Sequence, residues 1–265
     1  MHLIVTGNRK KAAAYLLAAQ QSNSLANVDA DRQLESILHD FPVQRKEDLI
    51  EYAKDHQQAI LENAILFSET SGTTARPLQT PRNSVDITWN THNQAFAYKR
   101  LVTAGTDRVA IIHPGVLSPF IEATTFALRH LEAGYVKLFP IQGICNYMRM
   151  IEVLERYAIT AIMTTPSLAL KVLHETARLN AFGRLKVHKL LLTGELISPA
   201  CIYNFKHILG PQCEVHAFVY GASETASLMY GVGNGLYKAF VDDFIFERTK
   251  PLSCWSPKLL SRQEM

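Results

Sequence analysis

From residue 108 onward, the sequence alternates short apolar runs with longer segments that open on helix-capping residues. Strands are predicted for five apolar runs: Val109–His113, Tyr135–Phe139, Thr160–Thr164, Val187–Leu192 and Glu214–Tyr220. Helices are predicted to follow Ser118, Asn146, Ser167 and Ser198. Gly134 and Gly210 are expected to end the first and last of these helices. The alternation predicts βαβ crossovers, and so an α/β fold with a largely parallel sheet flanked by helices.

The N-terminal part of the chain has a different pattern, which favours helices without intervening strands. Residues 10–21 are rich in alanine and leucine, Asp29 can cap a second helix, and Lys46 opens a segment with acidic residues in its first turn. We therefore expect a helical region over residues 1–62, an α/β core over 63–247, and a short irregular tail over 248–265.

Charge and composition exclude several classes of protein. A formal net charge of +3 gives no electrostatic reason to expect nucleic acid or an anionic membrane as a partner. The sequence contains no apolar stretch near the roughly 18–20 residues that a membrane helix needs, and its first apolar run is too short for a secretory signal. These observations predict a cytoplasmic protein.

The four cysteines form no Cys-x-x-Cys pair, which favours reduced thiols over a disulfide framework. Cys213 and His216 make one Cys-x-x-His, but no second pair completes a zinc site of that kind.

In open parallel sheets, ligands bind beyond the carboxyl ends of the strands. This rule directs attention to the loops that follow the predicted strands: Thr70–Pro77, His113–Ser118, Thr165–Ser167, Thr193–Ser198 and Tyr220–Thr225.

The first of these loops contains the strongest motif, Thr70-Ser71-Gly72-Thr73-Thr74, directly after an apolar run. Its hydroxyls and accessible backbone N–H groups suit phosphate oxygens. It is not a Walker A loop, because the Gly-Lys-Ser/Thr ending is missing. From composition alone, a Ser/Thr-rich turn before a proline explains the segment better than a phosphate loop does.

Two further motifs follow later strands. Tyr220-Gly221-Ala-Ser223-Glu224 places an aromatic ring, a hydroxyl and a carboxylate together, which suits a base, a phosphate and a magnesium ion. The nucleophile elbow of hydrolases is disfavoured here, because Thr225 replaces its last glycine and no histidine follows His216. Thr193-Gly194-Glu195 alone could be a simple strand-to-helix loop.

Taken together, these three motifs resemble the adenylate-forming superfamily of acyl- and aryl-CoA ligases, in particular its phenylacetate–CoA ligase-like branch. The resemblance runs from about residue 35 to 247 and includes Phe41–Leu49 and Tyr157–Leu168. It implies that ATP and a small carboxylic acid, aromatic acids among the options, form an acyl-adenylate. Coenzyme A or a carrier pantetheine would then take the acyl group.

The resemblance also implies roles for individual residues. Thr70, Ser71, Gly72, Thr73 and Thr74 would hold the β- and γ-phosphates. The rest of the nucleotide site would comprise Gly194 and Glu195 along the adenosine, Tyr220 with Gly221 at the adenine, Ser223 at the α-phosphate, and Glu224 on Mg²⁺.

The chain departs from the family pattern at two places. Ala75 stands where the phosphate loop usually has a glycine, and alanine resists backbone conformations that glycine permits. After Glu247 there is neither the Arg-Tyr-x-Thr-Gly-Asp motif nor the C-terminal domain with the catalytic lysine. No catalytic residue is therefore assigned, and adenylation is expected to need a C-terminal domain in trans. The expected partners are a protein that supplies this domain or an acyl carrier protein that supplies the acceptor thiol. A non-catalytic nucleotide- or acyl-binding module and a decayed ligase paralogue remain open as alternatives.

Overall fold

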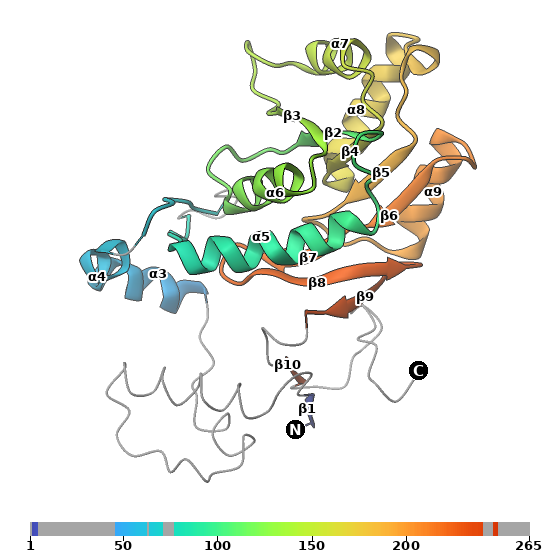
Figure 1. Cartoon of the computed structure of the whole chain (residues 1–265). Helices are drawn as coiled ribbons and strands as arrows, with labels where there is room; N and C mark the ends of the chain where they lie inside the picture. The colour runs from blue at the N-terminus through green and yellow to red at the C-terminus, as the bar shows by residue number, and fades with distance from the viewer. Residues whose placement is uncertain (1, 5–45, 63, 71–76, 241–245, 249–265) are drawn as a thin grey trace.

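The computed structural model describes residues 2–4, 46–62, 64–70, 77–240 and 246–248 (Figure 1). Its helices are α3 (Lys46–Asp55), α4 (Gln57–Glu62), α5 (Ser84–Lys99), α6 (Pro119–His130), α7 (Tyr147–Arg156), α8 (Pro166–Arg178), the 3₁₀ turn η1 (Phe182–Arg184) and α9 (Pro199–Leu209). Its strands are β1 (His2–Ile4), β2 (Arg108–Ile112), β3 (Gly134–Leu138), β4 (Ala161–Thr164), β5 (Lys189–Leu192), β6 (Glu214–Ala217), β7 (Val219–Ala222), β8 (Ala226–Gly233), β9 (Leu236–Ala239) and β10 (Phe246–Arg248).

The central sheet is parallel, with strand order β3-β2-β4-β5-β6, as the alternation of strands and helices predicts. The chain moves from β2 to β3 in one direction and then crosses back to β4 on the other side of β2. Because such crossovers are right-handed, this reversal puts α6 on one face of the sheet and α7, α8 and α9 on the other (Figure 1). The reversal creates a switch point between the carboxyl ends of β2 and β4, where ligands bind in folds of this type.

The two faces of the sheet have separate cores, and residues alternate between them along each strand. On β2, Ala110 and Ile112 belong to the cluster under α7, α8 and α9, whereas Val109 and Ile111 belong to the cluster under α5 and α6. Both faces are therefore covered, which explains the nearly continuous apolar runs of β2, β4 and β5.

A second, antiparallel sheet of β7, β8 and β9 lies beside α5 and carries the Tyr220 motif (Figure 1). The prediction of one strand over Glu214–Tyr220 is wrong. Phe218 divides this segment into β6, in the parallel sheet, and β7, in the antiparallel one. The Phe218 ring is buried in the core against Tyr98 of α5. Residues 217–220 are therefore all apolar, and the sequence does not mark the point where the chain passes from one sheet to the other.

Most predicted element boundaries agree with the structure within two residues, but two helix-end predictions are wrong. Gly134 opens β3 and does not end α6, because Glu132 supplies the left-handed conformation there (φ 55°). Thr165, not Ser167, caps α8, since its side chain accepts a hydrogen bond from Leu168 N–H and Pro166 occupies the first turn.

The helix predicted from Lys46 is α3, whereas the helices predicted for residues 10–21 and after Asp29 lie outside the described residues. The division into three regions stays a prediction. In the described part of the chain, no helix is both long and apolar enough to cross a membrane.

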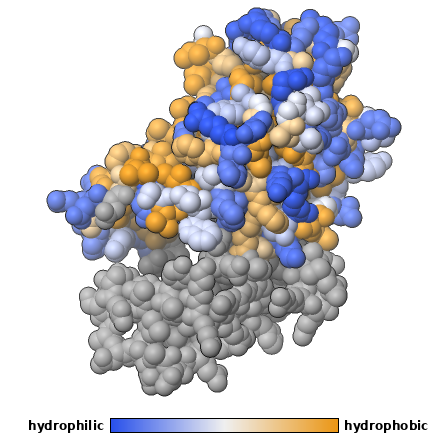
Figure 2. Space-filling model, viewed as in Figure 1, coloured by the Kyte–Doolittle hydropathy of each residue, from blue (hydrophilic) through white to orange (hydrophobic). Residues whose placement is uncertain are grey.

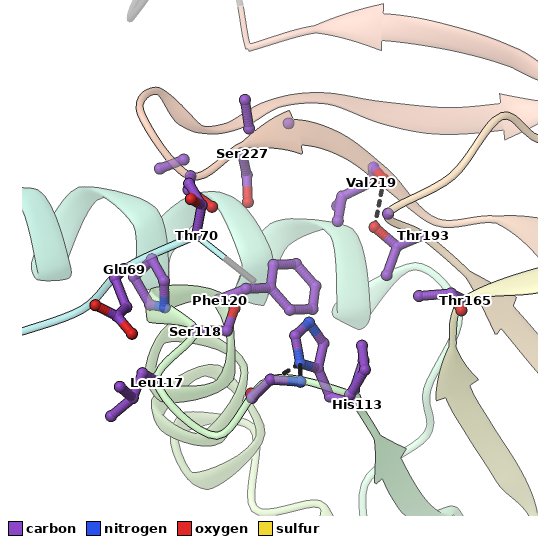
Figure 3. A pocket seen from close by; sticks show the side chains of 18 of the residues that line it. Glu69, Thr70, His113, Leu117, Ser118, Phe120, Thr165, Thr193, Val219 and Ser227 are labelled. Atoms are coloured by element: carbon purple, nitrogen blue, oxygen red, sulfur yellow. Dashed lines mark hydrogen bonds between the residues drawn. The ribbon is translucent and has the colours of Figure 1, made fainter. Parts of the chain in front are cut away.

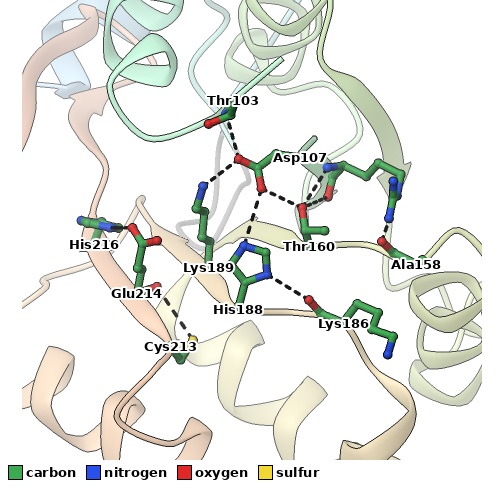
Figure 4. A network of polar contacts seen from close by, with 11 residues as sticks. Thr103, Asp107, Ala158, Thr160, Lys186, His188, Lys189, Cys213, Glu214 and His216 are labelled. Carbon is green, nitrogen blue, oxygen red and sulfur yellow. Dashed lines mark hydrogen bonds and ion pairs between the residues drawn. The ribbon is translucent and has the colours of Figure 1, made fainter. Parts of the chain in front are cut away.

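The amino end of the sheet, opposite the switch point, contains a buried ion pair (Figure 4). Lys189 Nζ lies 2.7 Å from Asp107 Oδ2, and the Asp107 side chain is only 1% exposed. Asp107 also accepts hydrogen bonds from Thr103 N–H and the Thr160 hydroxyl. Burial alone would raise the pKa of Asp107, but these donors together hold it below its ordinary value. The network ties β5 to the segments that enter β2 and β4.

Candidate nucleotide and acid site

A cleft of about 830 Å³ opens at the carboxyl ends of β2, β4 and β5, against the hairpin of β7 and β8 (Figure 3). All the loops predicted as ligand-binding contribute to its lining. They supply residues 70 and 77, 113–118, 165, 193–195 and 221–223. The cleft thus occupies the switch point that the strand order creates.

The hydroxyl-rich loop begins on an irregular hairpin whose two sides are held by polar side chains. Thr70 N–H donates to Leu78 O at 3.0 Å, and Leu78 N–H donates to the Thr70 hydroxyl at 2.9 Å. Below this pair, the buried Ser68 hydroxyl donates to Thr80 O. The hairpin therefore fixes both ends of the loop at the cleft, where Thr70 and Pro77 line the wall. Ser71, Gly72, Thr73 and Thr74 lie outside the described residues.

The apolar side of this hairpin forms part of an exposed apolar surface beside the cleft. Ile65 and Phe67 are 66% and 63% exposed, and Val116 and Leu117 are 57% and 56% exposed. Glu69 N–H donates to Leu117 O at 3.3 Å, which holds the two segments together. Figure 2 shows hydrophobic residues gathered on the flank of the molecule where α4 and α6 lie.

Gly194 and Glu195 line the cleft beyond β5, as the strand-end rule predicts. Gly194 has φ +80°, a conformation that side-chain-bearing residues rarely adopt, and an added Cβ would lie 3.2 Å from Thr165 Cγ2. The Glu195 carboxylate accepts hydrogen bonds from Ser167 N–H at 3.0 Å and from the Ser167 hydroxyl at 2.7 Å. Glu195 therefore joins the β5 loop to the N-terminus of α8, where a negative charge is favourable.

The Tyr220 motif begins in β7 and continues into the turn that leads to β8. Gly221 and Ser223 line the cleft, whereas Tyr220 and Glu224 are not among its lining residues in the described part of the chain. The Tyr220 ring is 44% exposed and packs edge-on against Tyr237, with ring centroids 6.0 Å apart. Glycine is required at position 221, because an added Cβ would lie 2.0 Å from Ala226 O.

Arg82 belongs to none of the three motifs, yet it connects the irregular hairpin before α5 to the hairpin of β7 and β8. Its guanidinium donates to Ser223 O and, at 3.4 Å, to Glu224 O. Burial lowers the pKa of Arg82, while the carboxylates of Asp86 and Glu224 oppose that shift. The side chain thus holds the Ser223–Glu224 turn in place through backbone carbonyls and puts a positive charge near Glu224.

His113 is a second residue that sequence reasoning left without a role. Its ring lines the cleft next to Phe120, with centroids 6.2 Å apart, and its Nδ1 lies 3.0 Å from Gly115 N (Figure 3). Nδ1 also lies 3.0 Å from Gly115 O, so it can accept from the Gly115 N–H or donate to the Gly115 carbonyl, according to which ring nitrogen carries the proton. Burial lowers the pKa of His113 by more than the Gly115 carbonyl raises it, which favours the neutral ring.

A polar floor, missed entirely at the sequence level, consists of Asn90, Gln94, Thr124 and Ser227. These side chains come from α5, α6 and β8, and all of them are buried. Asn90 and Ser227 line the cleft, and Gln94 and Thr124 lie behind them. No local motif signals this floor, because its members are far apart in the sequence.

The described residues contain no group of three or more His, Cys, Asp or Glu side chains that could hold a metal ion. A magnesium ion at Glu224 would therefore need ligands beyond these side chains, such as phosphate oxygens and water. Mg²⁺ commonly binds proteins in this way, through one or two carboxylates plus substrate phosphates.

Solved structures with this fold include the 2-hydroxyisobutyryl-CoA ligase in three states. The complex with 2-HIB-AMP and CoA in the thioesterification state has a TM-score of 0.69 at 16% identity, covering 89% of this chain and 51% of that chain. The open conformation with the same ligands has a TM-score of 0.68 at 16% identity, covering 89% of this chain and 56% of that chain. The postadenylation state with 2-HIB-AMP has a TM-score of 0.67 at 15% identity, covering 89% of this chain and 51% of that chain. At such identities the likeness shows the fold, and this chain spans about half the length of those ligases.

No curated protein matches this chain. The model of the AMP-binding enzyme family, in contrast, matches residues 2–255, which include the whole cleft and all three motifs. The chain therefore belongs to the AMP-binding enzyme family.

Proposed function

We propose that this chain binds ATP and activates a small carboxylic acid as an acyl-adenylate, for transfer to CoA or to a carrier thiol. The observation that carries the proposal is the convergence of three motifs far apart in the sequence. Thr70, Gly194, Glu195, Gly221 and Ser223 all line one cleft at the switch point of a parallel sheet. Family membership supports the same chemistry.

In this proposal, Thr70 and the loop residues Ser71, Gly72, Thr73 and Thr74 hold the β- and γ-phosphates. Ser223 contacts the α-phosphate, and Glu224 binds Mg²⁺ together with phosphate oxygens. Arg82 adds a positive charge beside Glu224, which would support the α-phosphate as its charge changes during attack by the carboxylate.

Tyr220 would stack on the adenine, with Gly194 and Glu195 along the adenosine. Its half-exposed ring is available for such stacking. The phenylacetate–CoA ligase-like branch and an aromatic acid belong to the proposal through the motif resemblance alone. So does a lysine-bearing C-terminal domain acting in trans, whereas the proposed cytoplasmic location rests on the lack of a membrane-length apolar stretch in the sequence.

The test is ATP–pyrophosphate exchange with a panel of small aliphatic and aromatic acids. The chain is assayed alone and with a separately expressed C-terminal domain of an AMP-binding enzyme. We expect acid-dependent exchange in at least one pairing. AMP binding, measured by calorimetry, is expected to weaken in Tyr220→Ala. Tyr203→Ala, a change at a 70% exposed tyrosine on α9, is the matched control and should bind AMP normally.

Two outcomes would count against the proposal. If AMP binds at a Tyr220-dependent site but no acid supports exchange in any pairing, the chain is a non-catalytic nucleotide-binding module. If neither AMP nor ATP binds, the chain is a decayed relative without this activity.

A further inference from the structure

The polar floor of the cleft is unusual because it is both buried and oriented. Asn90 is 8% exposed and Ser227 is 2% exposed, yet both line the cavity. In Figure 3 the Ser227 hydroxyl points into the space that Phe120 and His113 border from the other side. Any part of a ligand that fills this end of the cleft therefore meets polar groups already withdrawn from bulk water.

Hydrogen bonds behind the floor determine which polar atoms face the cavity. The Thr124 hydroxyl donates to Gln94 Oε1 at 2.5 Å, which fixes the amide so that Gln94 Nε2 donates to Ser227 Oγ at 3.3 Å. Asn90 Oδ1 accepts from Ser227 N–H at 3.2 Å. The acceptor atoms of Asn90 and Ser227 are thus already engaged within the protein.

Two hydrogen-bond donors at the floor can still donate to a ligand. Ser227 Oγ accepts from Gln94 and keeps its own proton free, and Asn90 Nδ2 has no hydrogen-bond partner among the described residues. We call the Ser227 hydroxyl and the Asn90 Nδ2 group the donor pair. A purely hydrocarbon substituent placed here would leave both donors desolvated and unpaired, which is costly.

The charge of the cleft also indicates which ligand groups can accept hydrogen bonds from the donor pair. Its described lining residues include Glu69 and Glu195 but neither lysine nor arginine. A second carboxylate on the substrate would be desolvated at the floor without a cation to compensate it. A neutral oxygen, either hydroxyl or carbonyl, satisfies the donor pair without that cost.

We propose that the donor pair selects small acids whose side chain carries a neutral oxygen, that is, hydroxy- or oxo-substituted carboxylic acids. The inference rests on the proposed function, since it assigns the acyl part of the substrate to this end of the cleft. It refines that function by favouring such acids over unsubstituted alkyl or aryl acids and over dicarboxylic acids.

The test uses binding, so that it does not depend on turnover. The probes are acyl-sulfamoyl adenosines, stable mimics of the adenylate, made in matched pairs in which a methyl group replaces the hydroxyl. Suitable acyl groups are lactyl and isobutyryl, 3-hydroxybutyryl and isovaleryl, and 4-hydroxybenzoyl and 4-methylbenzoyl. In at least one pair, the hydroxy member should bind about 10- to 100-fold more tightly, the range expected for one unsatisfied buried hydrogen-bonding group.

Variants connect this preference to the floor. Ser227→Ala should bring the two affinities of the preferred pair to within about threefold, mainly by weakening the hydroxy member. Asn90→Leu is a second variant, and each variant is checked for its melting temperature and for AMP binding. Ser84→Ala removes the hydroxyl of an exposed serine at the start of α5 and should leave the ratio unchanged.

The outcomes separate the two proposals. If AMP binds and every pair shows equal affinities, or Ser227→Ala and Asn90→Leu both leave the ratio intact, the inference is wrong and the proposed function stands. If neither AMP nor any analogue binds, both the proposed function and the inference are wrong.

Discussion

Arg82 offers the sharpest test of how the cleft is held together. Its guanidinium spans the two hairpins and donates to Ser223 O and Glu224 O, in the turn that is proposed to meet the α-phosphate. Arg82→Met removes the charge and both donors while keeping most of the aliphatic stem. Arg82→Lys keeps the charge but lacks the planar fork that reaches two carbonyls.

The size of the effect follows from the two contacts. A hydrogen bond from a charged donor contributes about 1.5–3 kcal/mol, and the longer contact to Glu224 O, at 3.4 Å, adds little. The half-buried turn can recover part of this through water. If AMP binding requires the turn in the position that Arg82 fixes, a net loss of about 1.5 kcal/mol would raise the Kd for AMP about tenfold.

The assay is calorimetric titration with AMP, with the melting temperature of each variant measured alongside. Arg82→Met should raise the Kd about tenfold, and Arg82→Lys should fall between it and the wild type. Arg100→Met is the matched control. Arg100 donates to Gly231 O at 3.2 Å, in β8 and away from the cleft. Its variant should bind AMP like the wild type.

Two results would refute this reasoning. One is an unchanged AMP affinity in a folded Arg82→Met variant. The other is an equal loss of affinity in Arg100→Met, which would mean that any weakening of the hairpin is enough and that the link to the turn has no particular role.

Three further predictions concern stability and backbone geometry. Asp107→Asn should lower the free energy of unfolding by about 3 kcal/mol, because Lys189 would stay buried without its partner. Since the folded-state pKa of Asp107 lies below its ordinary value, this contribution is complete above about pH 4 and is lost as the pH falls further. In urea unfolding, the difference in stability between the wild type and Asp107→Asn should therefore become smaller at low pH. A difference that grows at low pH would contradict this prediction. Gly221→Ala should weaken AMP binding in calorimetry, because its Cβ would lie 2.0 Å from Ala226 O, and unchanged binding would mean that the hairpin tip has no role in the site. Glu195→Gln should lower stability in urea by only about 0.5 kcal/mol through the lost charge at the start of α8, and a loss of several kcal/mol would be inconsistent with a helix-end contact.

The parallel sheet was predictable because its strands and helix starts are marked by local signals. The runs around Ile111, Met163 and Leu191 are apolar on both sides since both faces of the sheet are covered. Proline in the first turn and a preceding Ser or Thr likewise mark α6, α8 and α9. Helix α5 was missed for the opposite reason, because it buries Asn90 and Gln94 and so lacks an apolar stripe.

The motifs located the cleft but not the contacts that shape it. Thr70, Gly194 and Ser223 reach the cleft because each follows a strand or turn at the same edge of the fold. Arg82 and Ser227 act through partners more than 130 positions away along the chain, at separations of 141 and 137 residues. No local pattern encodes such pairs, and only the folded chain brings them together.

The central claim is that AMP-type ligands bind at the carboxyl ends of β2, β4 and β5. Hydrogen exchange with and without saturating AMP tests the place of binding directly. We predict slower exchange in segments 64–70, 193–196 and 220–227, and no change around the Asp107–Lys189 pair at the opposite edge of the sheet. Saturating AMP that leaves all three segments unprotected, or protects only the opposite edge, would contradict the account.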